Sequence, residues 1–193
     1  MHLIIYGPEG SGKGTQAKLL SQRLNLPVIT AGDLVREEAA DDKSEIGNIC
    51  RSSLIEGKYV SDEIMFTLWQ KKFSSKPKSG FILDGFPRNM NQAKFLFENA
   101  AKYNYQIDKV IYLKLSDEEA HKRLSKRNRK LFAGSNISHD TRQRIAQRLA
   151  TYRQQEKEMM NLFRQKNLLL EVNGEGSREE VFARILNGLN IAG

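Results

Sequence analysis

The chain has 193 residues, of which 39% are hydrophobic and 28% are charged, a balance typical of a globular protein that folds in water as one domain. No apolar run approaches the length of a membrane span, and no signal peptide is recognisable. The single cysteine, Cys50, excludes an internal disulfide and a multi-cysteine zinc site. We therefore expect a cytoplasmic protein without a membrane partner.

The formal net charge of +8 is concentrated in one part of the chain. Between Lys122 and Arg153 the sequence has ten Lys or Arg and one acidic residue, Asp140, whereas the rest is nearly neutral. Such a segment could bind nucleic acid or a membrane surface, or form an arginine-rich clamp around polyphosphate. Aromatic residues are sparse in it, so stacking on single-stranded bases has little support.

Short apolar runs alternate with amphipathic stretches along the chain. The apolar runs predict five buried parallel strands, at Leu3–Tyr6, Pro27–Thr30, Gly80–Leu83, Lys109–Leu115 and Leu168–Val172. The stretches between and after them predict helices over Thr15–Leu24, Asp62–Phe73, Asn91–Tyr103, Asp117–Lys126, Thr141–Gln165 and Ser177–Leu189. This alternation predicts an α/β fold, a doubly wound parallel sheet with ligands at the carboxyl ends of the strands.

A phosphate-binding loop directly follows the first predicted strand. Residues 7–16 read Gly-Pro-Glu-Gly-Ser-Gly-Lys-Gly-Thr-Gln. The glycines permit positive φ angles and leave room for phosphate oxygens, so several backbone N–H groups can converge at a helix N-terminus. Lys13 adds a positive charge for the β- and γ-phosphates, and Thr15 can place a hydroxyl on a magnesium ion. The generic motif has Ser or Thr directly after the lysine, whereas Gly14 intervenes here.

Four further motifs accompany this loop. They are Ala31–Arg36 (Ala-Gly-Asp-Leu-Val-Arg), Asp84–Arg88 (Asp-Gly-Phe-Pro-Arg), Arg123–Arg127 and Arg148–Tyr152. In this order and spacing the chain resembles the adenylate kinase family of nucleoside monophosphate kinases over essentially its whole length. The resemblance implies a P-loop NTPase-type fold with a five-stranded parallel sheet in a single domain, residues 1–193. It also implies a small helical acceptor-binding lobe at residues 30–60 and a short lid at about 127–138.

The residue types suit phosphoryl transfer. Moving a γ-phosphoryl group between two anionic nucleotides requires alignment and charge neutralisation, and little covalent help. No Ser/His/Asp or Cys/His constellation is recognisable, and His2, His121 and His139 have no obvious partners. Several arginines that converge on the phosphates are what this reaction needs.

The resemblance implies a role for each matching residue. Lys13, Asp84, Arg88, Arg127 and Arg148 would be catalytic, with Thr15 and Asp84 holding magnesium through water. ATP, the phosphoryl donor, would contact Gly10, Ser11, Gly12, Lys13, Gly14, Thr15, Arg123, Arg127 and Gly176. The acceptor monophosphate would contact Ala31, Arg36, Lys58, Tyr59, Val60, Gly85, Phe86, Pro87, Arg88, Gln92 and Arg148. We expect ATP, AMP and ADP as the partners, no nucleic acid, and a monomer.

Two departures from the family pattern leave alternatives open. Gln92, whose amide can both donate to and accept from adenine, favours AMP. Ala31 and Asn89 look more like UMP/CMP kinases. The lid pattern would place an arginine near position 137, where this chain has Ile137, and Arg129, Arg142 or Arg144 could substitute. Because of this altered lid and the basic segment, a nucleotide-dependent protein that binds RNA or another partner, with weak transferase activity, remains a second alternative.

Overall fold

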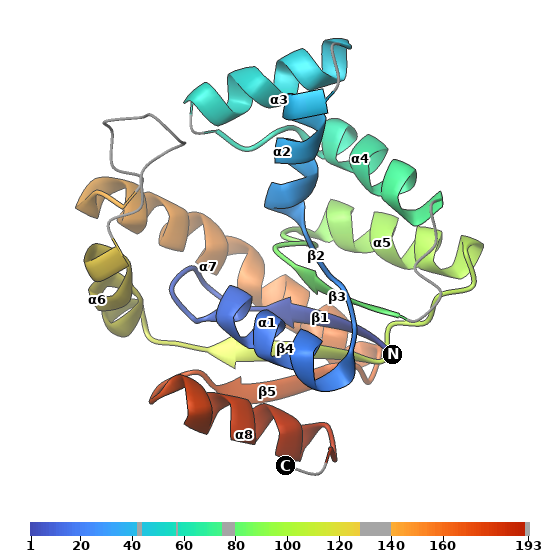
Figure 1. Cartoon of the computed structure of the whole chain (residues 1–193). Helices are drawn as coiled ribbons and strands as arrows, with labels where there is room; N and C mark the ends of the chain where they lie inside the picture. Colours follow the sequence, from blue (N-terminus) through green and yellow to red (C-terminus); the bar gives the residue numbers. More distant parts are fainter. Residues whose placement is uncertain (42–43, 57, 75–79, 128–139, 192–193) are drawn as a thin grey trace.

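The sheet of the protein has five parallel strands. In the computed structural model, which describes residues 1–41, 44–56, 58–74, 80–127 and 140–191, their order is β2-β3-β1-β4-β5. The strands are β1 (His2–Tyr6), β2 (Val28–Thr30), β3 (Phe81–Asp84), β4 (Lys109–Lys114) and β5 (Leu169–Asn173). β1 lies at the centre, where it pairs with both β3 and β4 (Figure 1). The α/β parallel sheet expected from the sequence is confirmed.

Helices cover both faces of the sheet (Figure 1). They are α1 (Lys13–Leu24), α2 (Ala31–Asp41), α3 (Glu45–Glu56), α4 (Asp62–Ser74), α5 (Met90–Lys102), α6 (Asp117–Arg127), α7 (Arg142–Gln165) and α8 (Arg178–Gly188). Alternation along each strand assigns side chains to opposite faces. Leu3 and Ile5 of β1 pack with α1 and α8, whereas Ile4 and Tyr6 pack with α4, α5 and α7.

The segment between β2 and β3 forms a group of helices at one end of the sheet (Figure 1). Within residues 30–60 this segment forms α2 and α3, and α4 follows them. Trp69 and Phe73 of α4 are fully buried and stack on each other, with ring centroids 5.3 Å apart. Trp69 also meets Phe86, so this aromatic contact fixes α4 against the loop that follows β3.

Three asparagines occupy left-handed conformations where helices end before strands. Asn25 caps α1 with φ 53°, Asn104 follows α5 with φ 58°, and Asn167 follows α7 with φ 56°. The next strands are β2, β4 and β5, so all three turns lie at the amino-terminal edge of the sheet. Asparagine tolerates this conformation better than most residues because its side chain bonds locally to the backbone.

Helix length and hydropathy give no sign of a bilayer-spanning element: in the described ranges, no helix is both long and apolar enough for one. The lid expected at about 127–138 lies outside the described residues apart from Arg127, which ends α6.

Candidate active site at the carboxyl edge of the sheet

The phosphate-binding loop connects β1 to α1 in the predicted place. Gly7, Gly10 and Gly12 have φ angles of 148°, 85° and 88°. A Cβ atom on Gly7 would lie 2.7 Å from the Leu113 carbonyl oxygen, and one on Gly10 would lie 3.1 Å from the Ala120 carbonyl oxygen. The loop therefore packs closely against the end of β4 and against α6, which only glycine permits at these two positions.

Lys13 lies at the first turn of α1 and curls over this loop. Its ammonium group donates to the carbonyl oxygens of Gly7 and Pro8, both at 2.8 Å. Burial lowers the pKa of Lys13, and the nearby carboxylates of Asp84 and Glu9 oppose that shift. The ammonium group thus lies inside the turn in which a phosphate would be bound.

Asp84 ends β3 beside the same helix N-terminus. A Cβ atom on Gly14 would lie 3.4 Å from the Asp84 Oδ2 atom, so this carboxylate faces the first turn of α1. Thr15 is exposed in that turn. A carboxylate and a hydroxyl beside a phosphate site fit Mg²⁺, which prefers oxygen ligands and keeps several of its waters. Burial raises the pKa of Asp84, whereas Lys13 and Arg88 act to lower it.

The residues that the sequence predicts for the acceptor lie mainly in the loop after β3, in the segment after α3 and on α2. Arg88 donates from Nε to the Gly85 carbonyl oxygen at 2.8 Å, and its guanidinium lies 4.2 Å from the centre of the Tyr59 ring. Gly85 has φ 78°, and a Cβ atom added to it would lie 3.9 Å from the Cβ of Ala31, the buried first residue of α2. Arg36 is exposed on α2 and pairs with Asp33.

Gln92 is buried, with 7% of its surface exposed, and its amide is engaged on both sides. Its Oε1 accepts from the Arg88 backbone N–H at 2.8 Å, and its Nε2 donates to Asp62 Oδ1 at 2.7 Å. Asn89 is the N-cap of α5: its Oδ1 accepts from the Gln92 N–H at 2.9 Å, and its Nδ2 also donates to Asp62. Asn89 therefore has a helix-capping role that needs no contact with a base.

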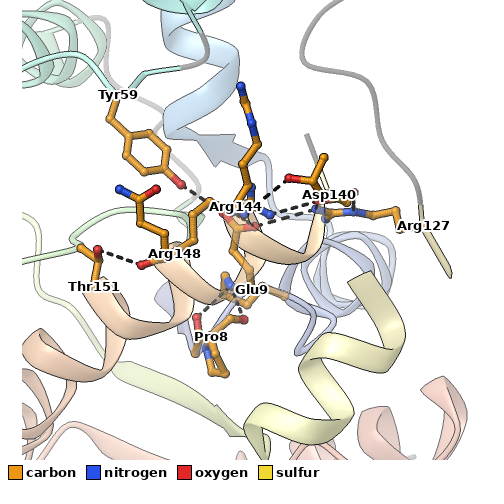
Figure 2. Close-up of polar contacts among 12 residues, drawn as sticks. Pro8, Glu9, Tyr59, Arg127, Asp140, Arg144, Arg148 and Thr151 are labelled. Carbon is orange, nitrogen blue, oxygen red and sulfur yellow. Dashed lines mark hydrogen bonds and ion pairs between the residues drawn. The ribbon is translucent and has the colours of Figure 1, made fainter. Parts of the chain in front are cut away.

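Two arginines from different helices meet at one buried carboxylate, as Figure 2 shows. The side chain of Asp140, just before α7, is fully buried. Its carboxylate accepts two hydrogen bonds from Arg127, from Nε at 3.0 Å and from NH2 at 2.8 Å, which makes a bidentate pair. It also accepts one from Arg148 NH2 at 3.0 Å. The bond to Asp140 raises the pKa of Arg127. Asp140 thereby joins the end of α6 to the first turns of α7.

Glu9 of the phosphate-binding loop lies beside the same two arginines. Its Oε2 accepts from Arg148 Nε at 2.9 Å and is 3.8 Å from Arg127 NH2 (Figure 2). Its Oε1 accepts from the Tyr59 hydroxyl at 3.0 Å. No sequence motif assigned a role to Glu9, although an acidic residue inside a glycine-rich phosphate loop was a visible signal. Asp62 and Asp140 were likewise missed as partners.

The remaining predicted residues lie in neighbouring loops and helices. Arg123 on α6 donates to Glu119 at 2.8 Å and reaches the Gly10 carbonyl oxygen at 3.5 Å. Gly176, with φ 104°, lies in the loop after β5. Lys58 is exposed and pairs with Glu56 at 2.7 Å, whereas Phe86 is buried. Other predicted positions lie in the loop and helix starts already described (Ser11, Gly12) or next to them (Val60, Pro87).

The arginine that the lid pattern lacks is not identified. Arg129 and Ile137 lie outside the described residues. Arg142 is exposed at the start of α7. Thr141 is the N-cap of α7, and its hydroxyl accepts from the Arg144 backbone N–H. The Arg144 side chain points away from Glu9 (Figure 2).

Known proteins resemble this chain over nearly its whole length. The family model described as "Adenylate kinase" matches residues 5–168. An adenylate kinase of Prochlorococcus marinus (strain MIT 9211) is 36% identical over 98% of this chain and 97% of its own length. An adenylate kinase of Bifidobacterium longum (strain NCC 2705) is 35% identical over 98% of this chain and its own full length. These matches agree with the phosphate-binding loop and the arginines at the edge of the sheet: the chain belongs to the adenylate kinase family and is a nucleoside monophosphate kinase.

Proposed function

We propose that this protein transfers the γ-phosphoryl group of ATP to AMP, giving two ADP, in a magnesium-dependent and reversible reaction. Its role would be to balance adenine nucleotides in the cytoplasm, acting as a monomer. The observation that carries the proposal is the convergence at one sheet edge of Lys13, Asp84, Arg88, Arg127 and Arg148. The names of the similar proteins support the choice of adenine nucleotides.

The donor would bind at the phosphate-binding loop, with Lys13 leaving the carbonyl oxygens of Gly7 and Pro8 for the phosphates. Arg123 and Gly176 would border its base. Asp84 and Thr15 would hold Mg²⁺ through water, and the ion would neutralise phosphate charge. No general base is required, since the acceptor phosphate is already ionised near neutral pH.

The acceptor would bind between the β3–α5 loop and the helical lobe at residues 30–60. Arg36 and Arg88 would hold its phosphate, and Arg127 and Arg148 would neutralise charge that develops during in-line transfer, an effect worth about 10³–10⁵ in rate for a single arginine. Gln92 would read the base. Its hydrogen bonds to Asp62 and to the Arg88 N–H determine the orientation of the side-chain amide, with Nε2 toward Asp62 and Oε1 toward the Arg88 backbone. Residues of the lid at about 127–138 would exclude water from the closed site.

The choice of acceptor is tested by measuring ADP formation from Mg-ATP with AMP, UMP and CMP offered separately. We expect AMP to give at least about tenfold higher kcat/KM than either pyrimidine nucleotide, the discrimination available to a hydrogen-bonded base site. A dominant UMP or CMP rate would mean that Ala31 and Asn89 set the pocket. An absence of turnover with every acceptor would contradict the proposal and favour the RNA-binding alternative.

A further inference from the structure

Glu9 is an unusual group to find where it lies. A carboxylate in a phosphate-binding loop repels the anion that the loop binds. Its neighbour Pro8 has a fixed φ, and Gly10, with φ 85°, packs so closely that an added Cβ atom would lie 3.1 Å from the Ala120 carbonyl oxygen. The carboxylate therefore extends from a closely packed part of the loop.

The partners of this carboxylate come from both sides of the site. Arg148 belongs to α7 and Arg127 ends α6, whereas Tyr59 follows α3 in the acceptor lobe. The Tyr59 ring also lies against Arg88, at 4.2 Å from the guanidinium carbon. One carboxylate thus connects the phosphate-binding loop to groups that the proposed function assigns to phosphate charge.

Arg148 and Arg127 contact the Glu9 carboxylate in the way that arginines contact anions in general. Arginine binds carboxylates and phosphates through the same N–H donors, so one anion can replace the other. The Arg148 and Glu9 side chains are only 15% and 27% exposed, so water screens their attraction less than it would at an open surface. Asp140 binds the NH2 atoms of both arginines, whereas Glu9 in the phosphate-binding loop binds the Nε atom of Arg148 and lies near the NH2 atom of Arg127.

We propose that Glu9 is a positioning residue that serves as an internal counter-ion: its carboxylate holds Arg148 and Arg127 toward the phosphate-binding loop, and the phosphates of a nucleotide displace it. Two consequences follow. The arginines are held near their working positions, which reduces the ordering required when a nucleotide binds. Phosphate binding is weakened, because the incoming anion must compete with an anion already in place. The inference rests on the proposed function only for the identity of the nucleotide.

The competition is tested with inorganic tripolyphosphate, which has the charge of a nucleotide tail and no base. Glu9→Gln keeps the shape of the side chain and removes its charge. We expect its Kd for tripolyphosphate, measured by titration calorimetry, to fall about tenfold, the effect of one unit charge a few ångströms from the anion in partly screened surroundings. The matched control is Glu98→Gln, which removes an exposed charge from α5 and leaves the Kd unchanged.

Two further variants separate charge from structure. Glu9→Asp keeps the charge, so its Kd stays nearer the wild-type value than that of Glu9→Gln. Tyr59→Phe removes only the hydroxyl that donates to Glu9, so its effect on the Kd is smaller than that of Glu9→Gln. An unchanged or weaker affinity in Glu9→Gln would overturn the proposal and leave Glu9 as an ordinary ion-pair partner. Thermal denaturation of each variant verifies that it is folded.

Turnover with Mg-ATP and AMP is measured in parallel. If the wild-type protein turns over and Glu9→Gln has unchanged affinity for tripolyphosphate, the counter-ion proposal is wrong and the proposed function stands. If the wild-type protein does not turn over but Glu9→Gln binds tripolyphosphate more tightly, the proposed function is wrong and the counter-ion proposal stands.

Discussion

At the scale of single residues, the site combines charges that are costly to bury. The carboxylate of Asp84 lies half-buried between Lys13 and Arg88, and burial raises its pKa in spite of both cations. An acid whose pKa is higher in the folded protein binds its proton more readily there than in the unfolded chain. Stability is therefore fully present below the ordinary aspartate pKa of about 3.9, falls as the pH rises through the raised value, and stays reduced above it.

Asp84→Asn, which mimics the protonated acid, should therefore raise the melting temperature at pH 7 by a few degrees. The gain should shrink as the pH is lowered toward the ordinary aspartate pKa, because the wild-type carboxyl then takes up its proton. The same variant should lose about 100-fold in turnover, since the carboxylate that would hold Mg²⁺ beside the phosphates is gone. Circular dichroism melts at pH 7 and pH 4.5 test this, with Glu98→Gln as the exposed control. A lower melting temperature at pH 7 would show that attraction to the two cations outweighs burial.

At the scale of elements, α6 and α7 are joined by two carboxylates in different surroundings. Asp140 is buried and binds Arg127 and Arg148, whereas Asp117 is 53% exposed and binds Arg153 at 2.7 Å. We expect Asp140→Ala to lower the free energy of unfolding by about 3 kcal/mol, because it leaves two partly buried guanidinium groups without this partner. The matched Asp117→Ala should cost less than about 1 kcal/mol, as is usual for exposed ion pairs. Urea denaturation measures both, and equal losses would contradict the role given to burial.

The elements themselves were largely predictable, and their contacts were not. The phosphate-binding loop is encoded locally, because its glycines supply the positive φ angles of the turn, and Asp84 follows a recognisable apolar run. Helix starts differed by one or two residues: α1 begins at Lys13 instead of Thr15, and α5 at Met90 instead of Asn91, since Asn89 is its N-cap. Glu9, in contrast, meets Tyr59 and Arg148 across 50 and 139 residues of chain. No local pattern encodes such contacts, which depend on how the helices pack.

At the scale of the whole molecule, phosphate binding should be linked to global stability, since the loop after β1 touches α6, α7 and the segment after α3. A ligand at about 100 times its Kd adds about 2.7 kcal/mol to the free energy of unfolding. For a chain of this size that corresponds to a rise of about 5–10 °C in melting temperature. We expect Mg-ATP to give this rise in a thermal-shift measurement, and adenosine, which lacks phosphate, to give little. A comparable rise with adenosine would mean that the base, and not the phosphates, dominates binding.

The three left-handed asparagines lie at the edge of the sheet opposite the candidate site. Asn25, Asn104 and Asn167 end helices there, and none of the predicted site residues leaves a strand at that edge. The candidate site and these turns therefore lie at opposite edges of the sheet. Substitutions or short insertions at these turns can therefore change the stability of the fold while the candidate site at the carboxyl edge is left unchanged. Among related proteins from habitats of different temperature, sequence differences that adjust stability are then expected to be concentrated at these turns.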